Sequence, residues 1–166
     1  WVLSALEQKL RPTKPVVIVL GPFMPQAVRQ RFQLRAEALE GVQTIVFNSN
    51  MELLMERSAG VVAMGGYNTF CEILSLDKPA LLIPRSTPRM EQTLRAHRAS
   101  SLGFVSMLDG DGDRSADVMA KALRKLEHQP VPSVAGTDRV LSGLEVICER
   151  TQSLLSAQRN RRRDIA

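Results

Sequence analysis

The residues best suited to bind an anion follow the short apolar run Gly60 to Ala63. They are Gly65-Gly66-Tyr67-Asn68-Thr69, with Glu72 one helical turn beyond Asn68. Two glycines between a strand and a helix leave backbone N–H groups accessible to a phosphate. Glycine pairs also form ordinary tight turns, and asparagine is a common helix cap. The spacing alone leaves both interpretations open: a phosphate-binding turn, or a structural turn with Asn68 as the cap.

Further polar side chains could extend such a site toward a sugar. The Glu72 carboxylate could accept hydrogen bonds from two ribose hydroxyls, as acidic residues do in dinucleotide-binding folds, or it could be a solvated helix carboxylate. Glu91 and Gln92 could bind sugar hydroxyls or cap a helix. Arg85 and Arg89 could neutralise a diphosphate or be ordinary surface charge.

These residues require strands and helices to position them, and the apolar pattern alternates between the two. The first strand, a continuous run of Val and Ile, is predicted to be buried on both faces. Thr87 is predicted to cap the helix that follows the fourth strand, with Pro88 as its first residue. The turn Asn48-Ser49-Asn50 and Ser115 are predicted to cap two other helices. The predicted strands are 16–20, 42–47, 60–63, 80–83 and 103–107, and the predicted helices are 27–39, 51–57, 68–76, 88–100, 115–127 and 138–158.

Strands and helices that alternate through short links predict an α/β domain, here residues 1–166. We expect a single doubly wound, mostly parallel sheet with helices on both faces. Ligands of such sheets bind beyond the carboxyl ends of the strands. The loops after the first four predicted strands should therefore meet at one edge, and the residues named above belong to the last two of these loops.

Composition excludes several classes of function. The 166 residues carry a net charge of +5, much of it in the basic tail 159–166, and only 4% are aromatic. Few aromatics argue against a nucleic-acid partner, while the tail allows peripheral contact with an anionic membrane or is simply solvated. No apolar run approaches the roughly 20 residues of a membrane span. Cys71 and Cys148 lack metal-ligand spacing, and His97 and His128 lack catalytic partners. We expect a cytoplasmic protein without a bound metal.

Three segments together resemble a known family. They are Gly65-Gly66-Tyr67-Asn68-Thr69-x-x-Glu72, Lys78-Pro79-Ala80-Leu81-Leu82-Ile83-Pro84-Arg85, and Pro88-Arg89-x-Glu91-Gln92. The combination resembles the C-terminal domain of family 28 glycosyltransferases, which includes the peptidoglycan N-acetylglucosaminyltransferase group. The resemblance covers about residues 14–127, and its most specific part is 60–92. It implies the Rossmann-like donor-binding half of a two-domain GT-B enzyme.

The resemblance also implies roles for individual residues. The domain would bind a nucleotide-sugar donor, a UDP-sugar by analogy, as part of an inverting glycosyltransferase. No cofactor or metal is implied, because the nucleotide-sugar is a substrate. The catalytic base and the acceptor site would lie in an N-terminal domain outside this chain, so the chain alone would be inactive. The implied donor-binding residues are Gly21, Phe47, Gly65, Gly66, Asn68, Thr69, Glu72, Arg89, Glu91 and Gln92.

Two alternatives remain at this point. A sugar-nucleotide epimerase shares the architecture. A non-catalytic nucleotide-sugar-binding subunit would instead need a separate acceptor protein as its partner. In that case the final helix would offer apolar residues to the partner, namely Leu144, Ile147, Leu154 and Leu155.

Overall fold

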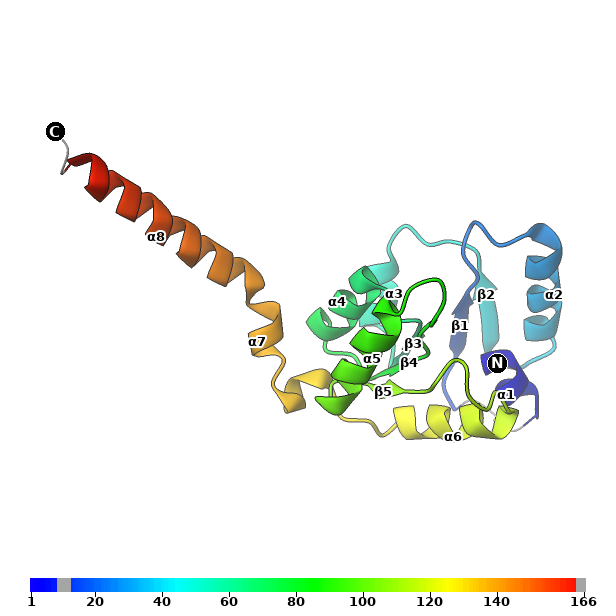
Figure 1. The fold of residues 1–166 in the computed structure, drawn as a ribbon. Coiled ribbons are helices and arrows are strands. Elements are labelled where there is room, and N and C mark those ends of the chain that lie inside the picture. The colour runs from blue at the N-terminus through cyan, green and yellow to red at the C-terminus, as the bar shows by residue number, and fades with distance from the viewer. Residues whose placement is uncertain (9–12, 164–166) are drawn as a thin grey trace.

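Parallel strands and the helices that connect them form the body of the protein in the computed structural model (Figure 1). The structure describes residues 1–8 and 13–163. The strands are β1 (Val16–Val19), β2 (Val42–Ile45), β3 (Val61–Ala63), β4 (Ala80–Leu82) and β5 (Ser106–Met107). The α-helices are α1 (Val2–Gln8), α2 (Gln26–Glu37), α3 (Met51–Glu56), α4 (Tyr67–Ser75), α5 (Glu91–Ser101), α6 (Ala116–Leu126), α7 (Asp138–Leu141) and α8 (Gly143–Arg163), with a 3-10 helix at Pro132–Ala135.

The strands pair in parallel, which confirms the α/β class. They fall into two hydrogen-bonded sheets, β1–β2 and β3–β4–β5, so the prediction of a single sheet was wrong. Val16 lies opposite Val42 in the first sheet, and Val61 opposite Ala80 in the second. A pocket lies between β1 and β3, lined also by side chains of α1 and α2, and no pairing joins these two strands in the described part of the chain.

Helices cover both faces of the three-stranded sheet because adjacent residues of β4 point in opposite directions. Ala80 and Leu82 pack with buried side chains of α3, α4 and α5. Leu81 packs on the other face with Met119 and other buried residues of α1 and α6. A third cluster joins α1 and α2 to the two-stranded sheet, around Val42. These layers hold the carboxyl ends of β3 and β4 in a fixed relation.

The first strand differs from its prediction in burial. Val17 and Val19 are 39% and 42% exposed, although the sequence predicts a strand buried on both faces. Side chains alternate between the two faces of a strand: Val16 and Ile18 pack against the cluster of α1 and α2, whereas Val17 and Val19 point to the other face. The sequence analysis also missed α1, whose signal was the buried, helically spaced Leu3 and Leu6.

Several element ends differ from the prediction. The helix after β4 begins at Glu91, with Met90 as its N-cap, so the assignment of Thr87 and Pro88 to the helix start was wrong. Side chains from the first turn of α5 instead bind the backbone of Arg85, before this segment. Strand β5 covers only the last two of the five predicted residues. The first of the five, Gly103, has a φ of +79° and belongs to the turn that precedes the strand.

The C-terminal part forms two helices where one was predicted. A break at Ser142 separates α7 from α8, and α8 extends away from the body (Figure 1). Helix α8 continues to Arg163, so residues 159–163 of the basic tail are helical, and 164–166 lie outside the described residues. Among the helices of residues 1–8 and 13–163, none is long and apolar enough to cross a membrane.

Candidate functional site

The predicted glycine pair joins the end of β3 to the start of α4. Gly65 is buried and has φ +75°, a conformation that favours glycine. A Cβ atom at this position would lie 3.1 Å from Cδ1 of Leu82, so the packing also favours glycine. At Gly66 a Cβ atom would meet nothing within 4 Å, which leaves open space in front of the helix.

Helix α4 begins without a side-chain cap. Its N-cap is Gly66, and the first backbone bond of the helix runs from the Phe70 N–H to the Gly66 carbonyl at 2.9 Å. Asn68 is the second helical residue and does not cap the helix, which rules out the structural-turn interpretation in the form that had Asn68 as the cap. By contrast, Asn50 and Ser115 cap α3 and α6 through their side chains, as predicted. The first N–H groups of α4 therefore remain available to an external acceptor.

Glu72 follows Asn68 by four residues, which places both on nearly the same face of α4. Asn68 is exposed, whereas Thr69 and Glu72 are half-buried. The Glu72 carboxylate makes no hydrogen bond or ion pair within the described part of the chain. It can therefore accept hydrogen bonds from a ligand that lies along this face.

Arg95 connects the glycine turn to the start of α5, and the sequence analysis missed it. Its Nη1 donates to the Gly65 carbonyl at 2.9 Å, and its Nη2 forms an ion pair with Glu91. Its guanidinium also lies 5.5 Å from the centre of the Tyr67 ring. The side chain is only 17% exposed. The Glu91–Arg95 spacing of four residues within a predicted helix was a signal that could have found this link.

The loop after β4 is attached to the first turn of α5. The Arg85 N–H donates to Oε1 of Gln92 at 3.3 Å, and the Thr93 hydroxyl donates to the Arg85 carbonyl at 3.3 Å. Arg85 and Arg89 are exposed. Gln92 therefore has a structural role in this loop, and Glu91, whose side chain is 59% exposed, keeps access to solvent beside it.

The remaining predicted residues belong to the other sheet. Gly21, with φ +82°, follows β1, and Phe47, 67% exposed, follows β2. The segments after β1, β3 and β4 meet at one end of the fold, because Met24, Met64 and Arg85 line the same pocket, and β2 runs parallel to β1. Arg95 ties the glycine turn to Glu91, and among residues 1–8 and 13–163 no hydrogen bond joins Gly21 or Phe47 to that group.

Large apolar side chains lie exposed among these loops, and the sequence analysis did not single them out as a set. We call them the apolar rim. Its members are Phe23 (97% exposed), Phe47 (67%), Met64 (52%), Tyr67 (65%) and Met90 (53%). The signal was a bulky apolar residue in each of the segments that follow the first four strands. Exposed apolar residues that gather around a polar site are typical of surfaces that contact a partner.

Comparison with known proteins identifies the fold and the family. The model of the glycosyltransferase family 28 C-terminal domain matches residues 2–132. A curated relative from Lachnospira eligens is 37% identical over 87 residues, and is named UDP-N-acetylglucosamine–N-acetylmuramyl-(pentapeptide) pyrophosphoryl-undecaprenol N-acetylglucosamine transferase. The match covers 51% of this chain and 24% of the relative, so the chain aligns with about a quarter of that protein.

Solved glycosyltransferases have the same fold at low sequence identity. The crystal structure of VinC in complex with dTDP matches 84% of this chain and 32% of its own, with a TM-score of 0.63 and 18% identity. The kitacinnamycin glycosyltransferase matches 95% of this chain and 37% of its own, with a TM-score of 0.58 and 20% identity. The extent of the family match and these structural likenesses agree with the GT-B architecture. The chain therefore belongs to the glycosyltransferase family 28 C-terminal domain family.

Proposed function

We propose that this domain binds the nucleotide-sugar donor of an inverting glycosyltransferase, with a uridine diphosphate carrier. The proposal depends on the start of α4, which follows Gly65 and Gly66 and has no side-chain cap. Arg95 connects this helix start to Glu91, because it contacts both the Gly65 carbonyl and the Glu91 carboxylate. A helix start that presents free N–H groups and open space suits a diphosphate. The uridine base rests on the relative from Lachnospira eligens, whose name includes UDP-N-acetylglucosamine.

The remaining groups complete the donor site in this proposal. The diphosphate accepts hydrogen bonds from the first turn of α4, with Asn68 and Thr69 as additional donors. The unpaired carboxylate of Glu72 takes the ribose hydroxyls. Glu91 and Gln92 at the start of α5 face the donor sugar, and Arg89 adds positive charge. Free backbone donors and the helix dipole would stabilise the diphosphate as it leaves the anomeric carbon.

The acceptor and the catalytic base belong, in this proposal, to an N-terminal domain that faces the apolar rim. The rim offers exposed apolar surface around the donor site, as an interdomain cleft requires. Transfer is then a direct displacement that inverts the anomeric carbon, and the isolated chain transfers no sugar. We place the intact enzyme in the cytoplasm. The arginines at positions 159–163 provide for peripheral contact with an anionic membrane.

The exposed apolar residues of α8 favour one alternative, a nucleotide-sugar-binding subunit that needs a separate acceptor protein. Leu144, Ile147, Leu154 and Leu155 of α8 are all exposed, between 57% and 74%. This fits a subunit that docks on a separate acceptor protein as well as it fits a two-domain enzyme. A sugar-transfer assay on the intact protein separates the two. For the epimerase alternative no comparable observation exists, and the relatives described above are all named as transferases.

Isothermal titration calorimetry with uridine, thymidine, guanosine and adenosine diphosphates tests donor binding. We expect UDP to bind more tightly than the other three nucleoside diphosphates. Glu72→Ala should weaken UDP binding by about 1–3 kcal/mol, the range for lost hydrogen bonds to a charged group. The exposed Glu56→Ala in α3 serves as the matched control and should leave the affinity unchanged. Absence of both heat and thermal shift with every nucleotide would refute the proposal, and an unchanged affinity in Glu72→Ala would remove Glu72 from the ribose role.

A further inference from the structure

Arg95 is an arginine of α5 whose whole side chain is confined at the donor-binding end of the fold. Its guanidinium contacts the Gly65 carbonyl at 2.9 Å, the Glu91 carboxylate, and the Tyr67 ring. The side chain is only 17% exposed, whereas Arg98, three residues further along the helix, is exposed. Arginines on a helix surface usually keep the charged head in water. The head of Arg95 is instead held between two segments of the chain.

The shape of the guanidinium explains why an arginine suits this position. The group is planar and directs its N–H donors in fixed directions. Nη1 donates to Gly65 and Nη2 to Glu91, so one rigid group links the two acceptors. A lysine, with a single ammonium on a flexible stem, does not fix two acceptors in this way. Arg95 therefore sets the position of the Glu91 carboxylate relative to the glycine turn.

The Gly65 end of this link is the more firmly held of the two. Gly65 is buried with φ +75°, and a Cβ atom there would lie 3.1 Å from Leu82, so close packing surrounds the turn. The same turn leads into the uncapped start of α4. Glu91, by contrast, has a side chain that is 59% exposed. The packed turn therefore holds the exposed carboxylate through Arg95.

Glu91 alone would oppose the binding of the proposed donor. Its carboxylate lies at the start of α5, which Arg95 connects to the diphosphate-binding start of α4 in the proposed site. A carboxylate in such a position repels the negative charge of a diphosphate. The ion pair of Glu91 with Arg95 carries no net charge. The repulsion is therefore offset while the carboxylate stays in place.

The contact with Arg95 leaves one oxygen of Glu91 available. Nη2 contacts Oε1, and Oε2 has no hydrogen-bond partner within residues 1–8 and 13–163. An ionised carboxylate accepts hydrogen bonds and donates none. Oε2 can therefore accept a hydrogen bond from a sugar hydroxyl while Oε1 stays bound to Arg95.

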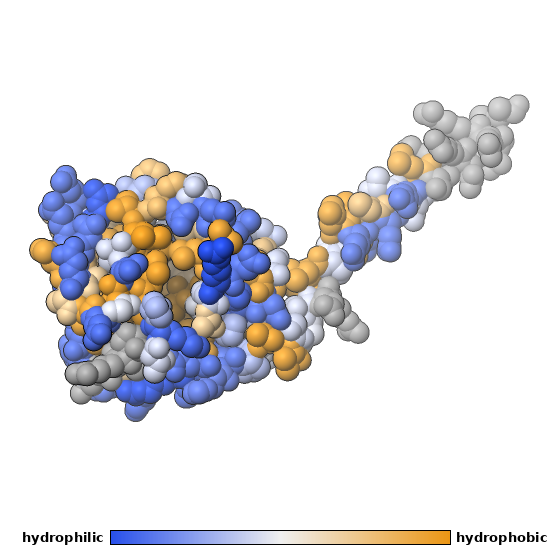
Figure 2. Space-filling view, turned by 180° about the vertical axis from the view of Figure 1, so that it is seen from behind, coloured by the Kyte–Doolittle hydropathy of each residue, from blue (hydrophilic) through white to orange (hydrophobic). Residues whose placement is uncertain are grey.

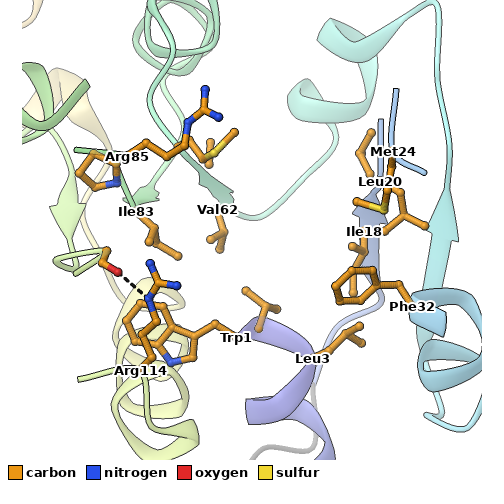
Figure 3. Close-up of a pocket in the computed structure, with 16 residues that line it drawn as sticks. Trp1, Leu3, Ile18, Leu20, Met24, Phe32, Val62, Ile83, Arg85 and Arg114 are labelled. Atoms are coloured by element: carbon orange, nitrogen blue, oxygen red, sulfur yellow. Dashed lines mark hydrogen bonds between the residues drawn. The ribbon is translucent and has the colours of Figure 1, made fainter. Parts of the chain in front are cut away.

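Other arginines at this end of the fold do not duplicate the role of Arg95. Figure 2 shows hydrophilic residues around an apolar hollow on the body. Arg85 and Arg114 line the pocket between β1 and β3, and Nε of Arg114 donates to the Gly110 carbonyl (Figure 3). Both arginines are exposed, and neither forms an ion pair with Glu91 in the described ranges. They add positive charge to this end without holding a carboxylate in place.

We propose that Arg95 is a positioning residue of the donor site, which holds the Glu91 carboxylate at the sugar end and offsets its charge against the diphosphate. This inference rests on the proposed donor-binding function. Arg95 is not itself a ligand of the donor here, because its Nη1 and Nη2 are engaged by Gly65 and Glu91. It acts through the glycine turn and through Glu91, so that one site takes a diphosphate and a neutral, hydroxyl-bearing sugar side by side.

Glu91→Gln tests the charge balance by calorimetry with UDP and with UDP-N-acetylglucosamine on residues 1–166. Without the Glu91 charge, Arg95 is no longer neutralised, so UDP should bind about threefold more tightly, as one unit charge at about 6 Å in water predicts. UDP-N-acetylglucosamine should not share this gain, because its sugar loses a charged acceptor. Glu56→Gln, the matched control at an exposed position of α3, should change neither affinity. An unchanged UDP affinity, or an equal gain for both ligands, would overturn the proposal.

A double variant separates this role from simple attachment of the turn. Arg95→Met should weaken UDP binding, and the addition of Glu91→Gln to it should recover about threefold in affinity, because no unpaired carboxylate then opposes the diphosphate. If Arg95 only attached the turn, the double variant would bind no better than Arg95→Met, since neither bonds to Gly65, and that result would refute the inference. A parent chain that binds neither ligand refutes the donor-binding function itself. A parent chain that binds UDP, with variants that fail these expectations, refutes the role of Arg95 alone.

Discussion

Arg95→Met tests whether a single side chain holds the donor site together. The substitution removes the charge and the hydrogen bonds while it keeps an unbranched, apolar stem of similar shape. It therefore breaks the contacts of Arg95 with the Gly65 carbonyl, with Glu91 and with the Tyr67 ring. We expect a less stable domain and weaker binding of UDP, because the glycine turn loses its attachment to α5.

The expected loss of stability follows from the three contacts. A hydrogen bond from a charged group to a buried carbonyl is worth about 1.5–3 kcal/mol. The Glu91 partner is 59% exposed, so the ion pair adds only about 0.3–0.5 kcal/mol after solvent screening. The cation–π contact with the exposed Tyr67 adds about 0.5–1 kcal/mol. Because neighbouring contacts are not additive, we expect about 2 kcal/mol in total.

Thermal unfolding and UDP titration together check this value. A loss of about 2 kcal/mol lowers the unfolding midpoint by about 4–8 °C in a domain of this size. Arg98→Met, at an exposed position of the same helix, is the matched control and should change stability by less than about 0.5 kcal/mol. Glu91→Gln should have a similarly small effect, because the bond to Gly65 remains. An Arg95→Met domain that unfolds and binds UDP like the Arg98→Met control would refute the positioning role of Arg95.

Further predictions concern the glycine turn and one ion pair. Gly65→Ala should lower the free energy of unfolding in urea by about 1–3 kcal/mol, because φ is +75° and Leu82 blocks the added methyl group. Gly66→Ala meets open space and should change it by less than about 0.5 kcal/mol. Equal losses in the two variants would contradict this reasoning. Hydrogen bonds from Arg35 lower the pKa of Glu7 below its ordinary 4.5. For so exposed a pair, these bonds stabilise the folded state by less than about 1 kcal/mol. This stabilisation is complete above pH 4.5 and is lost as the pH falls through the lowered pKa of Glu7. Unfolding of Glu7→Gln should therefore differ from the parent at pH 7 and converge with it in acid; a constant difference would count against the pair.

Local signals predicted much of the fold. The apolar runs of β1 to β4 and the capping residues Asn50 and Ser115 were identified correctly, because each depends on neighbours within a few residues. The errors fall where distant contacts intervene. Helix α5 starts at Glu91, and its first turn binds the backbone of Arg85, a contact between a loop and a helix that pattern alone does not contain.

The candidate site divides in the same way. Sequence spacing found the glycine turn and placed Glu72 on one face of α4 with Asn68. Sequence spacing could not decide that the N-cap of α4 is Gly66 and not Asn68, because both residue types are accepted as caps. It also missed that Arg95 reaches the Gly65 carbonyl across 30 positions of the chain.

The sequence by itself determined the α/β class, the order of the strands, and the family, because periodicity and short motifs are properties of consecutive residues. Only the tertiary structure decided how the strands divide into two sheets and which side chain ties the donor loops together. Both depend on distances between segments that the chain brings together only when it folds.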